Sequence, residues 1–304
     1  IFCPTESNMP QSYLSDEPGA RRGVENDFDP YRQVASRLTA LHEVGHPTDK
    51  VELLILGGSW TAYPRSYREW FIRRCFEALN EENPLDNQGE VSLKEAQKRN
   101  ESGKHRNVGL VVETRPDLIS RSELIFNRKL GVTKFQIGIQ SLDDHILTIN
   151  KRGHTVEQAR QAVDLLRAAG FKVVAHWMPN LLGATLESDH ADFAKLWLEG
   201  SIQPDELKIY PCQLLESAEL YHYWQRGEYQ PYTEEQLIDL LADIKPTVPR
   251  YCRINRVIRD IPSNNVVAGN RNTSLRQNVA RELERRGTRC NCIRCREVRG
   301  SQVQ

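Results

Sequence analysis

The sequence predicts an α/β fold in which a parallel sheet curls into a partial (β/α)6-type barrel. Two observations carry this prediction. Short β-rich apolar runs alternate with amphipathic helical stretches along most of the 304 residues, and repetition of this kind builds a parallel sheet through right-handed crossovers. Each apolar run also ends in a polar or glycine-bearing turn, which is typical of the rim where β/α barrels carry their chemistry.

Five runs are expected to be buried strands because they are short, apolar and rich in β-branched residues. They cover residues 51–58, 107–114, 134–140, 172–179 and 206–211. We expect one more strand before Ile1, because the loop that carries Cys3 needs a strand from which to extend. About six strands then form an open barrel rather than a closed one of eight.

The stretches between these strands have helical periodicity. They cover residues 64–80, 118–131, 155–170 and 188–200. The third has clear boundary signals, since Thr155 and Gln158 can form a capping box and Gly170 can end the helix. Residues 81–105 are polar and lack an apolar stripe over much of their length, which predicts a surface insertion.

The strand–helix rhythm stops after Pro249, and the chain is expected to divide there. Residues 1–249 form the predicted barrel, and residues 250–304 a basic extension. Within the extension, residues 250–262 predict a strand, and residues 272–287 a basic helix capped by Thr273 or Ser274 and closed by Gly287. A cysteine cluster follows directly.

Composition points to a soluble protein of the cytoplasm. Hydrophobic residues make up 39% of the chain and charged residues 27%, enough for a buried core. No apolar run is long enough to cross a membrane, and no signal peptide is visible. The chain has seven cysteines, an odd number, and their crowding near the C-terminus favours metal binding in a reducing compartment over a disulfide framework.

The net charge of zero hides an uneven distribution. From residue 250 to residue 300 there are thirteen arginines, no lysine and four acidic residues, a local balance of +9. Arginine makes planar, bidentate contacts to phosphate, so the segment suggests nucleic-acid binding. A solvated helical face remains an equal alternative.

Polar residues at the predicted strand ends are the candidates for a site. Gly57 and Gly58 let a backbone approach a ligand closely, although such a pair is common in α/β proteins. Glu113 fits a ligand contact or a local salt bridge. Gln140, in a strand otherwise expected to be buried, needs a partner from a loop or a ligand. Lys208 is the most telling, because a lysine at an apolar strand end is costly without an anionic partner.

Three cysteines near the C-terminus predict a metal site. Cys290, Cys292 and Cys295 lie within six positions among arginines, and nearby cations favour the thiolate that binds metal. A tetrahedral zinc site needs a fourth ligand, for which Cys252, Cys212 or a histidine are candidates. The alternatives are an iron–sulfur site or reduced surface thiols.

Eight motifs together resemble one family closely, in the family's order and over nearly the whole chain. In this sequence they read CPTESNMPQSYLSDEPGA, LGGSWTAYP, VVETRPD, GIQSLDD, KRGHT, HWMPNLLGAT, LKIYP and RVIRDIP. They resemble the radical S-adenosylmethionine (SAM) part of the catalytic subunit of Elongator, the third Elongator protein, in its bacterial or archaeal single-chain form.

The resemblance implies a tRNA-modifying enzyme with a radical SAM barrel. Such enzymes install a carboxymethyl-type group at carbon five of the wobble uridine, using a [4Fe–4S] cluster, SAM and acetyl-CoA. Acetyl-CoA binds a separate acetyltransferase-like domain that is C-terminal in the family and that we expect to lie outside this chain. Two of the three cluster cysteines are likewise expected upstream of Ile1, so the chain as written is expected to be catalytically incomplete.

The resemblance also implies roles for individual residues. Cys3 matches the last cluster cysteine, and Gly57 and Gly58 match the motif that contacts the methionine amino group of SAM. The nucleoside pocket is implied for Glu113, Gln140 and Lys208, the last two as catalytic candidates. The implied zinc ligands are Cys290, Cys292 and Cys295. The implied basic surface for the tRNA anticodon stem-loop comprises Arg253, Arg256, Arg259, Arg271 and Arg276.

Two other functions remain open at this point. A tRNA-binding scaffold could use the same fold without a cluster, and another radical SAM enzyme, such as one acting on porphyrins, could share the GIQS motif. Cys3 itself could be an incidental thiol in a trimmed segment. The resemblance leaves open Elongator-like partner subunits or a homodimer, and implies no membrane partner.

Overall fold

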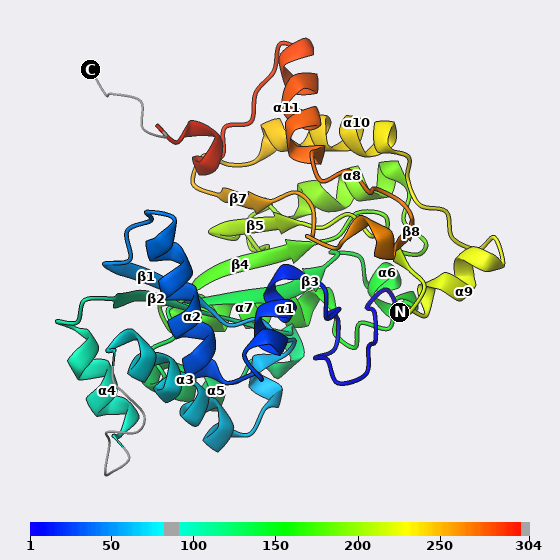
Figure 1. Cartoon of the computed structure of the whole chain (residues 1–304). Helices are drawn as coiled ribbons and strands as arrows, with labels where there is room; N and C mark the ends of the chain where they lie inside the picture. The colour runs from blue at the N-terminus through cyan, green and yellow to red at the C-terminus, as the bar shows by residue number, and fades with distance from the viewer. Residues whose placement is uncertain (82–90, 299–304) are drawn as a thin grey trace.

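The computed structural model describes residues 1–81 and 91–298. Its main sheet contains six parallel strands in the order β1-β2-β3-β4-β5-β7, and a separate antiparallel pair joins β6 to β8. The strands are β1 (Lys50–Leu54), β2 (Arg106–Thr114), β3 (Lys134–Gln140), β4 (Lys172–Trp177), β5 (Glu206–Ile209), β6 (Leu214–Leu215), β7 (Arg253–Arg256) and β8 (Val266–Ala268). The predicted α/β partial barrel is therefore confirmed (Figure 1).

Helices surround this sheet. They are α1 (Pro18–Glu25), α2 (Pro30–Glu43), α3 (Arg65–Leu79), α4 (Leu93–Asn100), α5 (Arg121–Lys129), α6 (Asp144–Ile149), α7 (Val156–Ala168), α8 (Leu186–Lys195), α9 (Leu220–Gln225), α10 (Glu234–Ile244) and α11 (Leu275–Arg285). The capping box at the start of α7 forms as predicted, and Gly170 follows the helix with φ +75°. Within the described residues, no helix has both the length and the apolar character needed to span a bilayer.

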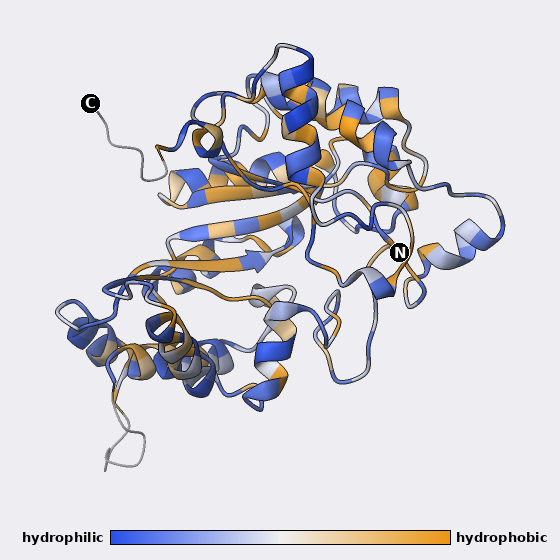
Figure 2. Cartoon of the chain, turned by 45° about the horizontal axis from the view of Figure 1, so that its top comes forward, coloured by the Kyte–Doolittle hydropathy of each residue, from blue (hydrophilic) through white to orange (hydrophobic). Residues whose placement is uncertain are grey.

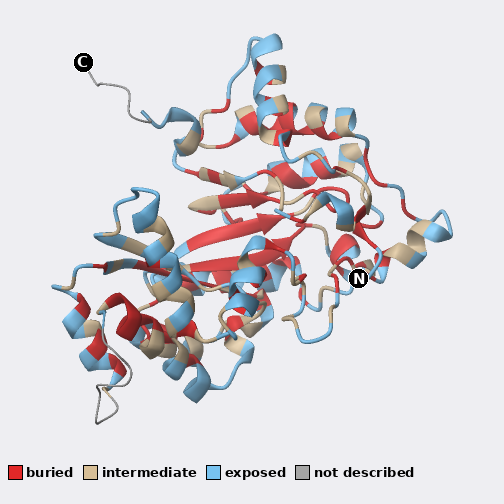
Figure 3. Cartoon of the chain, in the orientation of Figure 1, coloured by how far each residue is buried: buried red, intermediate tan, exposed pale blue. Residues whose placement is uncertain are grey.

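The core lies between the central strands and the helices. In β3 and β4 every residue after the first is buried, and Figure 3 shows these strands as the most buried part of the sheet. Many helices have one hydrophobic and one hydrophilic side (Figure 2), as expected where helices cover one face of a sheet.

One of the six described strands comes from the predicted C-terminal extension. β7, from the predicted extension, pairs in parallel with β5 at one edge of the sheet, and the strand expected upstream of Ile1 stays a prediction. The predicted division at residues 249 and 250 thus falls between two elements of one sheet. The division into two domains stays a prediction. The last residues of the predicted extension, 299–304, lie outside the described residues.

The predicted surface insertion is partly a helix. Residues 82–90 lie outside the described residues, but α4 follows them, with Leu93 and Ala96 buried. Its N-cap is Ser92, whose hydroxyl accepts a hydrogen bond from the backbone N–H of Glu95. The apolar stripe of α4 is too short to stand out in a polar sequence.

Candidate active site

A cavity of about 780 Å³ follows the concave side of the sheet. Residues from the irregular segment before α1, from β1 to β5, from β7 and from the segment after β7 line it. Among the described residues, ten arginines and lysines and five acids line the cavity. An anionic ligand is therefore favoured there, although the chain as a whole is neutral.

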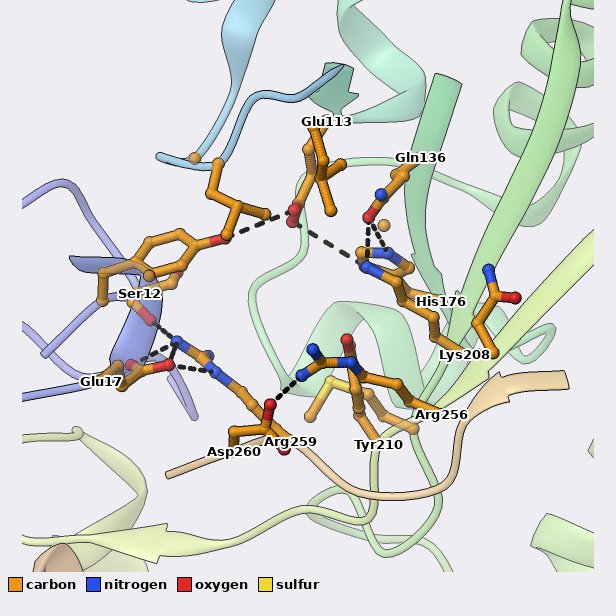
Figure 4. Close-up of a pocket in the computed structure, with 18 of the residues that line it drawn as sticks. Ser12, Glu17, Glu113, Gln136, His176, Lys208, Tyr210, Arg256, Arg259 and Asp260 are labelled. Carbon is orange, nitrogen blue, oxygen red and sulfur yellow. Dashed lines mark hydrogen bonds and ion pairs between the residues drawn. The ribbon is translucent and has the colours of Figure 1, made fainter. Parts of the chain in front are cut away.

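Four polar side chains from neighbouring strands meet at the centre of this cavity (Figure 4). Strand register brings Glu113 of β2 beside Gln136 of β3, and His176 of β4 beside Lys208 of β5. The Gln136 Oε1 accepts hydrogen bonds from Lys208 Nζ and from His176 Nε2, the latter at 3.0 Å. On the other side, Glu113 Oε1 lies 3.8 Å from His176 Nδ1, and Glu113 Oε2 accepts from the Tyr13 hydroxyl at 3.4 Å.

Burial changes the acid–base properties of these groups. It raises the pKa of Glu113, against the opposing charges of Lys208 and Arg259. Burial and the same two cations lower the pKa of His176 well below its usual value, and burial lowers the pKa of Lys208 to about 8. Because the amide oxygen of Gln136 can only accept, Nε2 of the neutral His176 carries the hydrogen, and the Nδ1 lone pair faces the carboxyl of Glu113. Glu113 and His176 are therefore the two candidate proton carriers at the centre of the cavity.

Gln140, at the end of β3, is held in an unusual conformation. Its φ is +73°, rare for a residue with a side chain. Its backbone carbonyl accepts from Met178 N–H at 2.8 Å, and the next two residues, Ser141 and Leu142, donate to the buried carboxylate of Asp192. The side chain is 8% exposed, yet its Oε1 has no hydrogen-bond partner. A buried amide oxygen left unpaired inside a cavity is consistent with a ligand contact.

The two glycines follow β1, where the chain turns toward the N-terminal segment. Gly57 has φ +134° and Gly58 has φ +83°, conformations that side chains rarely adopt. A Cβ on Gly58 would lie 3.6 Å from the carbonyl oxygen of Gln11, and one on Gly57 would lie 3.8 Å from Pro10. Gly58 lines the cavity, so its backbone is available to a ligand there.

Cys3 lies in the same cavity, half-buried. Cys212 also lines it but is 2% exposed, and burial raises the pKa of its thiol to about 12. Cys3 is therefore the better ligand of the two. The [4Fe–4S] cluster and SAM implied by the resemblance fit these residues, since a thiol, a glycine turn and the unpaired Gln140 oxygen share one cavity.

The five predicted RNA-binding arginines separate into two groups. Three of them, Arg253, Arg256 and Arg259, line the cavity and pair with Glu297, Asp260 and Glu17 respectively. Arg271 is exposed and donates to the carbonyl of Val267 at 2.5 Å. Arg276 is half-buried and donates to the carbonyls of Ile254 and Asn255 in β7.

The three C-terminal cysteines come together as the sequence suggested. The sulfur atoms of Cys290, Cys292 and Cys295 all lie within 4.8 Å of one another, close enough to hold a metal ion. Cys212, one of the candidates for a fourth ligand, is excluded because it lies in the cavity near Cys3. Cys252 is buried near Cys292, but it is not part of the group of three.

Sequence reasoning missed several of these contacts. His176 is buried and hydrogen-bonded, as a core histidine would be, yet it also lines the cavity. Tyr13 and Asp192 were not singled out, because their roles depend on contacts with residues 100 and 50 positions away. No local signal in the sequence marks such contacts.

Two family models and several known proteins match this chain. The Radical SAM superfamily matches residues 2–194, and the Radical_SAM C-terminal domain matches residues 204–285. The chain is 44% identical over 303 residues to a tRNA uridine(34) acetyltransferase of Methanocaldococcus infernus, covering 98% of this chain and 56% of the relative. It is 35% identical over 305 residues to Elongator complex protein 3 of Homo sapiens, covering 98% and 54%.

A solved structure is also similar. The archaeal Elp3 of Methanocaldococcus infernus with an N-terminal deletion (1-46) has a TM-score of 0.86 and 44% sequence identity, covering 91% of this chain and 63% of that one. The chain spans a little over half the length of the two curated relatives described above. It therefore belongs to the radical SAM superfamily, and the resemblance of its motifs to the third Elongator protein is confirmed by these relatives.

Proposed function

We propose that the protein containing this chain modifies the wobble uridine of tRNA, attaching a carboxymethyl-type group from acetyl-CoA at carbon five of the base. The names of the relatives support the substrate. The observation that carries the proposal is the cavity itself, because it combines Cys3, the turn at Gly58 and the buried Lys208 in one place. A scaffold that only binds RNA has no need of a buried lysine in the same cavity as Cys3.

Membership of the superfamily implies a [4Fe–4S] cluster and SAM. When bound, these groups supply the electron and the sulfonium from which a 5′-deoxyadenosyl radical forms, able to activate the methyl group of acetyl-CoA. Cys3 would hold iron, and the backbone at Gly57 and Gly58 would receive the amino group of the methionine part of SAM. Gln140, with its unpaired oxygen, would contact the nucleoside.

The remaining cavity residues bind, orient and exchange protons. The Lys208 ammonium, donating to Gln136, would hold an anionic group of a ligand. Glu113 and His176, 3.8 Å apart, are the two groups that could take a proton from a ligand or return it. Because β3 and β4, which line part of the cavity, are buried after their first residues, groups held against them would be shielded from solvent.

The arginines at the edge of the cavity would receive the anticodon stem-loop. Arg253 and Arg256 line the cavity, and Arg271 is exposed on a neighbouring turn. Arginine suits phosphate contacts, and an unpaired loop base can be drawn out of its stack toward the cavity. Arg276 and Arg259, the other two predicted contacts, are largely occupied by protein acceptors.

The other components are assigned by the resemblance. Zinc is proposed for the triad of Cys290, Cys292 and Cys295, and acetyl-CoA for a separate acetyltransferase-like domain. A cytoplasmic location fits the seven cysteines, all of them described and none in a disulfide. Partner subunits or a homodimer would be consistent with the Elongator relatives.

The experiment is a single-turnover assay on the whole protein as encoded in its genome. After anaerobic reconstitution with iron and sulfide, it is incubated with SAM, acetyl-CoA and tRNA. The expected products are 5′-deoxyadenosine and a nucleoside modified at the wobble position, both measured by mass spectrometry.

Two controls make the assay specific. A tRNA with cytidine at the wobble position should yield no modified nucleoside. The Lys208→Met variant should lose product, whereas Lys172→Met, at an exposed position on the next strand, should not. Tight tRNA binding without any 5′-deoxyadenosine would instead favour the scaffold function and overturn the proposal.

A further inference from the structure

A partly buried ion pair connects the segment before α1 to the segment after β7, at the lining of the cavity. Arg259, after β7, donates to both carboxylate oxygens of Glu17, with Nη2 at 2.7 Å and 3.0 Å and Nε at 3.2 Å. The same Nη2 also donates to the backbone carbonyl of Ser12. Figure 4 shows the guanidinium pointing at these acceptors. Glu17 is 6% exposed, so this carboxylate depends on Arg259 to compensate its charge.

Other contacts join the same two segments. Asn265 donates to both carboxylate oxygens of Asp16, at 2.8 Å and 3.0 Å. The guanidinium of Arg259 lies over the ring of Tyr13, 5.2 Å from its centre. A small apolar cluster closes the contact, formed by Leu14, Leu215, Ala218, Ile261 and Val266.

The loop thus anchored leads directly to Cys3. We call residues 3–17 the cysteine loop. Inside it, Leu14 N–H donates to Glu17 Oε1 at 3.0 Å and Ser15 N–H donates to Glu6 Oε2 at 2.9 Å, while Ser12 N–H donates to the carbonyl of Pro4 at 3.2 Å. Hydrogen bonds therefore run from Arg259 to the residue that follows Cys3.

The acceptors of Arg259 also argue against a phosphate contact. Its donors are directed at Ser12 and Glu17 inside the protein, and its side chain is 25% exposed. Arg256, three residues earlier, is 49% exposed and pairs with the equally open Asp260. A phosphate can compete for Arg256 far more easily than for Arg259, because drawing Arg259 away would leave the Glu17 carboxylate buried and unpaired.

We propose that Arg259 is a positioning residue, which holds the cysteine loop against the segment after β7 through Glu17 and Ser12, and that it does not contact RNA. The inference rests on the proposed function only where it assigns Cys3 to the cluster. It replaces the RNA-binding role that the sequence suggested for Arg259. It also explains how Tyr13 reaches Glu113, because the loop carries both Tyr13 and Cys3 into the cavity.

The test compares Arg259→Gln, Glu17→Gln and Arg256→Gln in the whole protein. Hydrogen exchange of the backbone amides in residues 4–17 is measured first, before any cluster is reconstituted. Arg259→Gln and Glu17→Gln should both speed exchange there by at least about tenfold, because each leaves a charge without its partner, while amides in β3 and β4 keep their rates. Arg256→Gln should leave exchange in the loop unchanged.

Two more measurements separate positioning from RNA contact. After anaerobic reconstitution, the electron paramagnetic resonance spectrum of the reduced cluster should change on addition of SAM in the wild type, and this change should weaken in Arg259→Gln and Glu17→Gln alike. For an anticodon stem-loop RNA, Glu17→Gln removes no positive charge, so an RNA contact by Arg259 predicts weaker binding in Arg259→Gln only. Positioning predicts equal RNA affinity, within about twofold, in these two variants.

Amide exchange in residues 4–17 and RNA affinity together distinguish a positioning role for Arg259 from an RNA contact. Unchanged exchange in residues 4–17 of Arg259→Gln would overturn the inference, as would weaker RNA binding confined to that variant. Faster exchange in both Arg259→Gln and Glu17→Gln supports it. If no variant and no wild-type protein bound tRNA, the proposed function would fail, and the exchange measurement would still decide the role of Arg259.

Discussion

Lys208 provides the sharpest test of the cavity, because its buried charge should weaken the folded state near neutral pH. Its side chain is 7% exposed, and burial lowers its pKa from 10.5 to about 8 although Glu113 opposes this. Methionine has a similar length and no charge. The Lys208→Met variant should therefore be more stable than the wild type.

The expected gain follows from that pKa. The difference between 10.5 and about 8 corresponds to about 3 kcal/mol, at 1.36 kcal/mol per pKa unit. Losing the hydrogen bond to Gln136 removes about 1 kcal/mol of this gain. Since His176 continues to donate to Gln136, the acceptor is not left unpaired. The net increase in the free energy of unfolding should be about 1–3 kcal/mol at pH 7.

The gain should depend on pH in a defined direction. Below pH 8 Lys208 is charged in the folded and unfolded chains alike, and its full cost is present. Between pH 8 and pH 10.5 the folded chain has lost a proton that the unfolded chain still binds, so wild-type stability rises with pH through this contribution. The advantage of Lys208→Met should therefore shrink across that window.

Urea unfolding at pH 7 and near pH 10 measures the effect, with Lys172→Met as an exposed control. The control should change stability by less than about 0.5 kcal/mol. A Lys208→Met variant less stable than the wild type at pH 7 would refute the reasoning. So would a gain that stayed constant up to pH 10, because it would show that the lysine is not strained by burial.

Three further predictions follow from other parts of the structure. Burial raises the pKa of Asp189 from 3.8 to about 7, so its contribution to stability should fall as pH rises through that range, and Asp189→Asn should flatten the pH dependence of the urea midpoint. Gly58→Ala and Gly45→Ala should each lower the free energy of unfolding by about 1–2 kcal/mol, because both glycines have positive φ. Calorimetry of the reconstituted protein should show weaker SAM binding only for Gly58→Ala. Equal SAM binding by the two variants would contradict the place of Gly58 in the cavity. Cys292→Ser should lower the zinc content measured by mass spectrometry. Cys75→Ala, at a buried thiol outside the cysteine triad, should leave the zinc content unchanged. Zinc retained in Cys292→Ser would exclude the triad as a metal site.

Local patterns in the sequence were enough to predict the elements that surround the site. Alternation of apolar runs and helices predicts a parallel sheet, and its neighbouring strands bring residues such as Glu113 and Lys208 toward one cavity. Three cysteines within six residues are near one another in any compact conformation, which is why that group was predictable. The motifs alone also led to the correct family.

The tertiary structure decided the contacts between distant segments. That β7 joins the sheet beside β5 depends on which edge is free for pairing, and no local propensity encodes that choice. Similarly, thirteen arginines look alike in the sequence, yet Arg259 is turned toward Glu17, 242 positions away. The sequence by itself determined the elements and the chemistry of their ends, because these depend on neighbours along the chain. Only the tertiary structure determined which charges are buried and with which partners, because burial and pairing depend on neighbours in space.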